Sequence, residues 1–164
     1  MNVSDSARRY IVMGLALFVI LVLITASIIG NKQDIAFQNN NVLYGLMTQQ
    51  LQEGNYSDAL VAAEVLGESQ KSSEVVNYFT ALAAINLGEI DKALMYMQRA
   101  LNINPHKVED SMFMLQYAEM LVEAEKKAEA IQVLERCEVL SVPESYPDYK
   151  ERILQLQEQL ATQM

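Results

Sequence analysis

The chain has 164 residues, a formal net charge of −9 at pH 7, one cysteine, one histidine and no tryptophan. An acidic chain repels phosphate backbones, so we expect no binding to nucleic acid. A single cysteine excludes an intrachain disulfide, and a zinc site would need carboxylates from distant segments. Cys137 lies in an apolar helical pattern, so we expect it to be a small buried residue.

An uncharged apolar block occupies residues 10–30. As a helix it would be about 31 Å long, which matches the hydrocarbon core of a bilayer. Residues 1–9 contain Arg8 and Arg9, so the positive-inside tendency places them in the cytosol and the rest of the chain on the other side of the membrane. We therefore expect a single-pass membrane helix over residues 10–30, a linker over residues 31–39 and an extracytoplasmic domain, in keeping with a bacterial cell envelope.

Two other interpretations of this block are weaker. A cleavable signal peptide usually has a shorter apolar region that ends at a small-x-small site, whereas Thr25, Ala26 and Ser27 lie inside the block. A helix that is apolar on every face is also a poor candidate for the core of a small domain. The sequence therefore favours a retained membrane anchor.

A repeat follows the apolar block. Segments beginning at Gly54 and Gly88 lie 34 residues apart, and each carries an acidic residue before an Ala-Leu pair. A third segment begins at Glu125 after a spacing of 37, as though three residues near Val108–Asp110 had been inserted. Each segment indicates a turn between two helices, because glycine adopts the left-handed conformation that ends a helix at low steric cost.

This pattern resembles the tetratricopeptide repeat (TPR) family, most closely in residues 74–107, where Gly88, Ala93, Ala100 and Pro105 occupy the family's positions. The resemblance implies an all-α solenoid, in which each unit is an antiparallel helix pair and stacked units share a core. Within a repeat domain of residues 40–146, the implied units are residues 40–73, 74–107 and 111–144. Glu125 departs from the family's turn glycine.

Residues 147–164 indicate one further helix, which Pro147 can open at its first position. Its apolar stripe, at spacings of four, three and four, consists of Tyr149, Ile153, Leu156 and Leu160. We interpret this segment as a helix that caps the last repeat. The alternative, a short coiled-coil seam for self-association, has only about two heptads to support it.

Residues suited to catalysis are scarce. His106 lies in a predicted turn between repeats, and the acidic side chains Glu119, Glu123, Glu125 and Glu129 at helical spacing indicate a solvated face rather than a cation site. No glycine-rich phosphate loop is present in the sequence. We expect no catalytic residue, no metal site, no cofactor and no small-molecule substrate.

The TPR resemblance implies a binding surface. In this family the first helices of successive repeats line a concave surface that holds a peptide or helix of a partner. The implied partner-binding residues are Tyr44, Thr48, Gln52, Tyr78, Leu82, Asn86, Leu115, Glu119 and Glu123. Members that bind chaperone tails clamp a carboxylate with lysines and asparagines, which these positions mostly lack, so an apolar or mildly basic segment is the better ligand. Tyr78 and Leu82 could equally belong to the core.

Three hypotheses of function follow. The leading one is a membrane-anchored TPR scaffold or adaptor that binds another envelope or membrane protein through the concave surface. The second is an accessory subunit of a stable membrane complex, held mainly by the membrane helix, in which Ala26 and Gly30 form a small-xxx-small pair. The third is a chaperone-like factor in cytochrome c maturation or protein secretion.

Overall fold

The computed structural model describes residues 18–23, 25 and 38–162. The chain divides into two compact units, Met1–Val42 and Leu43–Met164. In the first unit, the described residues are helical and almost all are exposed.

The predicted membrane helix over residues 10–30 and the predicted linker over residues 31–39 lie mostly outside the described residues. Among those that are described, no helix combines the length and the apolar character needed to cross a membrane. Residues 38 and 39 are already helical. The first helix of the repeat region therefore begins before residue 40, where the first repeat was predicted to start.

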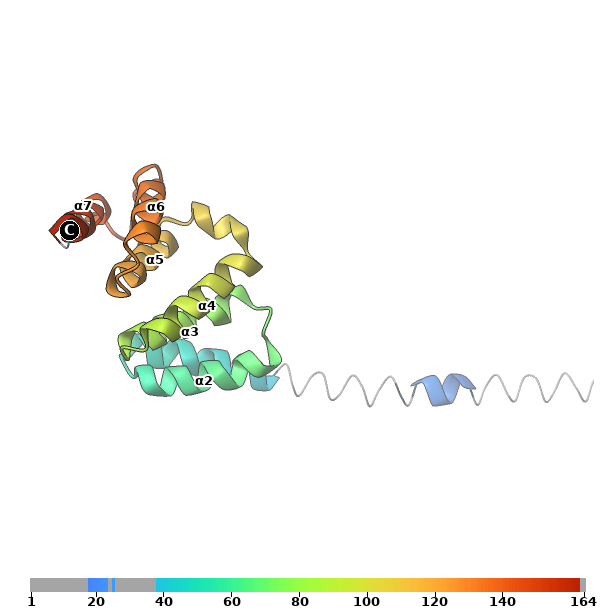
Figure 1. The fold of residues 1–164 in the computed structure, drawn as a ribbon. Coiled ribbons are helices and arrows are strands. Elements are labelled where there is room, and N and C mark those ends of the chain that lie inside the picture. Colours follow the sequence, from blue (N-terminus) through green and yellow to red (C-terminus); the bar gives the residue numbers. More distant parts are fainter. Residues whose placement is uncertain (1–17, 24, 26–37, 163–164) are drawn as a thin grey trace, which may run out of the picture. The chain divides into compact units, whose positions relative to one another are not determined.

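The second unit consists of helices and turns throughout its described residues. In chain order these are helical residues 43–52, α2 (Tyr56–Ser69), α3 (Glu74–Asn86), α4 (Ile90–Ile103), the 3₁₀ helix η1 (Pro105–Glu109), α5 (Ser111–Glu123), α6 (Lys127–Glu138) and α7 (Tyr149–Thr162). Figure 1 shows α3 against α4 and α5 against α6, and these are the pairs with the most extensive contact. The predicted all-α architecture is confirmed for this part of the chain.

The turn inside each helix pair has one repeated geometry. Gly54, Gly88 and Glu125 have φ angles of 77°, 75° and 55°. In each case the N–H of the following residue donates a hydrogen bond to the carbonyl five positions earlier, at 2.8, 3.0 and 2.9 Å. This arrangement ends a helix by satisfying its last carbonyl groups. The third turn therefore keeps the geometry of the other two, although a glutamate occupies the strained position.

Replacing Glu125 with glycine is expected to raise the free energy of unfolding by about 0.5–1 kcal/mol, because a left-handed φ strains a residue that has a Cβ atom. The matched control is Glu135→Gly, which places the same substitution at an exposed position inside α6. This control should lower stability by about 1 kcal/mol. Urea unfolding followed by circular dichroism measures both, and a loss of stability in Glu125→Gly would contradict the prediction.

Two of the α-helices, α3 and α5, begin at side-chain caps. The Ser73 hydroxyl accepts a hydrogen bond from the N–H of Val76 at 3.3 Å and so caps α3. An Asp110 carboxylate oxygen accepts from the N–H of Phe113 at 3.1 Å and so caps α5. The predicted insertion before the third repeat falls in η1 and the cap that follows it, so the extra residues extend the connection and leave the helix pair intact.

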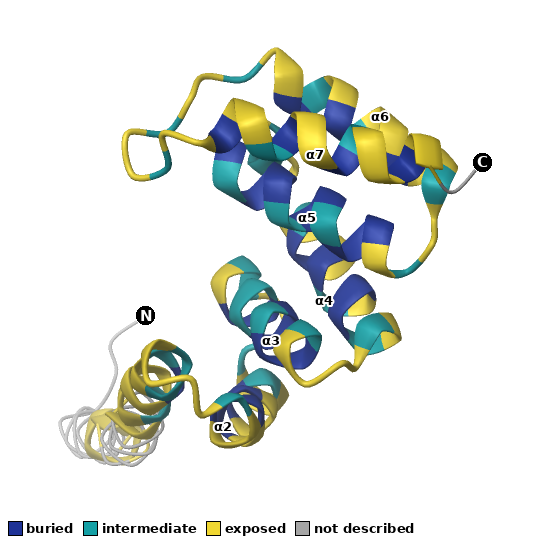
Figure 2. Cartoon of the chain, turned by 90° about the vertical axis from the view of Figure 1, so that its left-hand side faces the viewer, coloured by how far each residue is buried: buried dark blue, intermediate teal, exposed yellow. Residues whose placement is uncertain are grey.

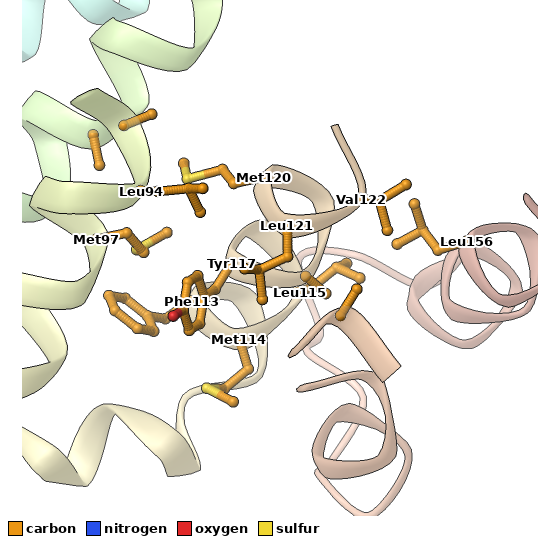
Figure 3. Packing of buried hydrophobic residues seen from close by; sticks show 14 of the residues in the cluster. Leu94, Met97, Phe113, Met114, Leu115, Tyr117, Met120, Leu121, Val122 and Leu156 are labelled. Carbon is orange, nitrogen blue, oxygen red and sulfur yellow. The ribbon is translucent and has the colours of Figure 1, made fainter. Parts of the chain in front are cut away.

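Buried apolar side chains form two clusters. The smaller one joins helical residues 43–52, α2 and α3 around Met47 and Leu66, which are both 0% exposed. The larger one runs from α2 to α7 and includes Met97 and Phe113, and Figure 3 shows its side chains meeting between α4 and α5. Cys137 is 0% exposed, as the sequence predicted.

Helix α7 buries one face against α5 and α6, which Figure 2 shows as dark blue positions along it. The predicted stripe is confirmed, since Tyr149, Ile153, Leu156 and Leu160 are at most 4% exposed. Pro147 does not open the helix. It lies in a turn closed by a hydrogen bond from the N–H of Tyr149 to the carbonyl of Tyr146 at 3.2 Å, and proline suits the second position of such a turn.

Candidate partner-binding surface

The predicted surface residues lie on helical residues 43–52, α3 and α5. Of the nine, eight are at least partly exposed, and we call these eight the first-helix surface: Tyr44, Thr48, Gln52, Tyr78, Leu82, Asn86, Glu119 and Glu123. Tyr78 and Leu82 also pack against the larger core cluster, so each belongs in part to the core and in part to the surface.

Leu115 does not belong to this surface. Its side chain is 2% exposed and lies in the larger core cluster, together with the buried residues of α7. Figure 3 shows Val122 of α5 and Leu156 of α7 pointing toward one another, which locates the contact between these helices. The family resemblance implied that Leu115 lies on the binding surface. The prediction is wrong for this residue, because its side chain is buried and cannot contact a partner.

Glu119 is held by a residue of α7. Its carboxylate lies 2.6 Å from the Arg152 guanidinium Nε, and the two side chains are 34% and 37% exposed. A half-exposed pair of this kind contributes little to stability. Its main effect is local, because Arg152 neutralises the carboxylate that the third repeat contributes at this position.

A row of aromatic rings crosses the first helices. The ring centroids are 6.1 Å apart between Tyr44 and Phe79, 5.4 Å between Phe79 and Tyr78, and 5.4 Å between Tyr78 and Phe113. These separations fall within the range of favourable aromatic pairs. Phe113 is buried, Phe79 and Tyr78 are half-buried, and Tyr44 is 38% exposed. The row therefore begins in the core and ends at solvent.

The polar side chains of Thr48, Tyr78 and Asn86 on this surface form hydrogen bonds within the protein. The Tyr78 hydroxyl donates a hydrogen bond to Gln116 Oε1 at 2.5 Å. The Thr48 hydroxyl and the Asn86 amide each donate to a carbonyl of their own helix, at 3.0 and 2.8 Å. Burial, reinforced by the charge of Asp110, raises the pKa of Tyr78 above its ordinary value, so this hydroxyl is neutral at physiological pH.

A small charged cluster borders the aromatic row. The Lys107 ammonium lies 5.7 Å from the ring centroids of both Tyr78 and Phe113. It is 3.0 Å from a carboxylate oxygen of Asp110 and 3.4 Å from one of Glu74. Partial burial disfavours the Asp110 carboxylate, but the N–H of Phe113 and the Lys107 ammonium outweigh this cost and lower the pKa of Asp110.

The lowered pKa of Asp110 predicts an acid-dependent loss of stability. The carboxylate stabilises the fold fully above its unfolded-state pKa of about 3.9, and this contribution disappears as the pH falls through the lower folded-state value. Asp110→Asn keeps a good capping residue but removes the charge. Urea midpoints measured from about pH 5 to about pH 2 should therefore fall less steeply in this variant than in the wild type. Equal slopes would contradict the assignment.

Residues near the surface that were not predicted include Phe79, Gln116 and Arg152. Phe79 and Gln116 occupy the same register, one residue after Tyr78 and Leu115, so extending the repeat alignment by one position would have found both. Arg152 carried no such signal, because only the docking of α7 on α5 brings it to Glu119.

Within the residues that the structure describes, no group of three or more histidine, cysteine or acidic side chains is close enough to hold a metal ion. His106 lies exposed in η1, and Cys137 is buried. What the second unit presents on its first helices is a partly aromatic set of side chains in which Glu119 and Glu123 are the acidic members.

Solved structures share this fold. The TPR2B domain of yeast Sti1, in its complex with pHsp70, superposes with a TM-score of 0.62 at 15% identity, over 77% of this chain and 99% of that one. The Yersinia enterocolitica type III secretion chaperone SycD, in complex with a peptide of the translocator YopD, gives a TM-score of 0.58 at 21% identity, over 74% and 89% of the two chains. These similarities confirm a TPR-like solenoid in the second unit.

A comparison of the sequence with models of protein families also indicates a TPR-type repeat protein. No protein with a curated description matches the sequence. The model of the family described as "Anaphase-promoting complex, cyclosome, subunit 3" matches residues 52–137, which is more than half of the chain. The match extends from the end of the first helix to α6 and so covers the repeated turns. The chain therefore belongs to this family of TPR-type repeat proteins.

Proposed function

We propose that this protein is a membrane-anchored TPR scaffold or adaptor that binds another envelope or membrane protein through the first-helix surface. The observation that carries the proposal is the aromatic row, which crosses three first helices and ends at solvent with Tyr44. Exposed aromatic side chains beside half-buried aliphatic ones are typical anchors for a protein partner. This role requires no catalytic group.

Two structural relatives support a peptide or helix as the ligand. The Sti1 domain is described in complex with pHsp70, and SycD in complex with a YopD peptide. Both share the stacked helix pairs found here. We propose by analogy that a partner segment lies along the first helices of this chain.

The proposed location follows from the sequence. We propose that residues 10–30 span the membrane, with residues 1–9 in the cytosol and the repeats on the other side. A short connection between anchor and repeats would keep the first-helix surface close to the bilayer. The partner we propose is therefore a protein in or near the same membrane.

Site-specific crosslinking in intact membranes tests the proposed surface. A photoreactive amino acid at Tyr44 should crosslink to a partner, whereas the same probe at Val61, which is 59% exposed on α2, should not. Tyr78→Ala combined with Leu82→Ala should remove the crosslink from position 44. A crosslink that is equally strong from both positions, or that survives the double substitution, would contradict the proposal.

Two further experiments separate the alternatives. If the membrane helix itself held the partner, replacing residues 10–30 with an unrelated anchor would abolish the crosslink from position 44, whereas our proposal expects it to persist. A reporter enzyme that is active only outside the cytosol, fused after Met164, should be active. An inactive reporter would reverse the proposed orientation.

A further inference from the structure

The first-helix surface carries little formal charge, although the chain has a net charge of −9. In the first two repeats its positions hold tyrosine, threonine, glutamine, leucine and asparagine, none of which is charged at neutral pH. Charged residues enter only in the third repeat, as Glu119 and Glu123, and Arg152 neutralises Glu119 at 2.6 Å. Among these eight positions, one carboxylate without an ion pair, that of Glu123, remains. Beside them, Lys107 is paired with Asp110 at 3.0 Å and with Glu74 at 3.4 Å.

Several polar groups of this surface already form hydrogen bonds within the protein. The donors of Thr48, Tyr78 and Asn86 are already used in hydrogen bonds within the protein. A partner that covers the Thr48 and Tyr78 hydroxyls therefore does not strip water from an unpaired donor, which would cost free energy. Binding can then draw on the apolar area of Tyr44, Tyr78 and Leu82.

Exposed acidic side chains lie at the turns between paired helices and on other helices of the second unit. Glu53 lies at the first turn, Glu89 and Asp91 at the second, and Glu125 at the third. Lys92 lies 2.9 Å from Glu89 and so pairs one of these carboxylates. The net negative charge of the chain disfavours a strongly acidic partner, and a strongly basic partner would meet exposed carboxylates at many places besides the aromatic row. The electrostatics thus favour a neutral ligand for the first-helix surface.

We propose that the partner segment is an uncharged one, whose aliphatic or aromatic side chains pack on the aromatic row and on Leu82. This inference rests on the proposed function and specifies the chemistry of the ligand. Because burial of apolar area drives such binding, affinity depends little on ionic strength, unlike binding steered by charge.

Three blocked helical peptides serve as probes for the full chain in nanodiscs. The first contains only leucine, alanine and glutamine, and the other two replace two glutamines with glutamate or with lysine. Fluorescence anisotropy gives the dissociation constants. The neutral peptide should bind most tightly, and its affinity should change less than about twofold between low salt and about 0.5 M NaCl.

Substitutions locate the binding. We expect the dissociation constant of the neutral peptide to rise by about tenfold in Tyr44→Ala, and also in the double variant Tyr78→Ala, Leu82→Ala. Val61→Ala, on the exposed face of α2, should leave this dissociation constant unchanged. Thermal midpoints measured by circular dichroism identify any variant that has lost its fold. Tyr44→Ala alters a partly exposed side chain and keeps the test informative if the double variant unfolds.

Leu82→Glu provides a gain-of-function test. It places a carboxylate on the first-helix surface. The variant should bind the lysine peptide more tightly than the neutral one, and its affinity for the lysine peptide should fall by about tenfold between low salt and about 0.5 M NaCl.

The inference and the proposed function fail in different ways. If a charged peptide binds more tightly than the neutral one, loses affinity in salt and remains sensitive to Tyr44→Ala, the ligand chemistry is wrong but the surface is right. If no peptide binds, or if binding ignores every substitution on the surface, the proposed function fails as well.

Discussion

Tyr149→Ala is expected to lower the free energy of unfolding by about 3–5 kcal/mol, the usual cost of deleting a fully buried aromatic side chain. Tyr149 is 0% exposed and is the largest fully buried side chain in the part of the chain that the structure describes. Its hydroxyl donates a hydrogen bond to the carbonyl of Cys137 at 3.1 Å and so ties the start of α7 to the end of α6. Loss of this anchor should release α7 and expose the last helix pair.

Tyr149→Phe is the matched control, because it keeps the ring and removes only the hydroxyl. It removes one hydrogen bond from the Cys137 carbonyl, which still accepts from the N–H of Leu140 at 3.2 Å, and should cost about 0.5–1.5 kcal/mol. Urea unfolding measures both variants, and hydrogen exchange should show faster exchange in α6 and α7 for Tyr149→Ala. Equal losses in the two variants would show that the hydrogen bond, rather than the packing of the ring, holds α7.

Phe113→Ala should have a comparable effect, about 3–5 kcal/mol, at the junction between the second and third repeats. Phe113 is 1% exposed, packs on the Tyr78 ring at 5.4 Å and lies below the Lys107 ammonium. Since each repeat in a solenoid is stabilised by its neighbours, a cavity at this junction should uncouple the two halves. We expect the unfolding transition measured by circular dichroism to broaden or to split into two steps.

Phe113→Leu keeps most of the volume and should cost clearly less than Phe113→Ala. Val139→Ala, at a position that is 72% exposed, should change stability by less than about 0.5 kcal/mol. If Phe113→Ala lowered stability while the transition stayed single and sharp, the two halves would be coupled through other contacts.

Features that depend on local spacing could be predicted from the sequence. Gly54 and Gly88 marked two turns, because left-handed backbone has a known residue preference. The stripe beginning at Tyr149 predicted a buried face on α7, since its spacing follows the helical period. The third turn was recognisable only from the period, because Glu125 replaces the residue that normally marks it.

Features that depend on how helices dock could not be predicted in the same way. Leu115 and Tyr78 occupy equivalent positions in their repeats, yet Leu115 is buried and Tyr78 is partly exposed. The difference arises because Leu115 is in the last repeat, where α7 packs on α5 and α6. The same docking brings Arg152 to Glu119 across 33 positions of sequence. A repeat pattern describes an average unit, so it does not show how the last unit of the solenoid packs against the helix that follows it.

The burial of Cys137 also has a chemical consequence. Desolvation raises the pKa of its thiol, so little of the reactive thiolate form exists at neutral pH, and the sulfur is shielded from solvent. Because it is the only cysteine in the chain, the folded protein should resist both disulfide exchange and peroxide oxidation. A chain with this property can work in an oxidising compartment without a redox partner, and a cysteine introduced at Tyr44 could be labelled selectively.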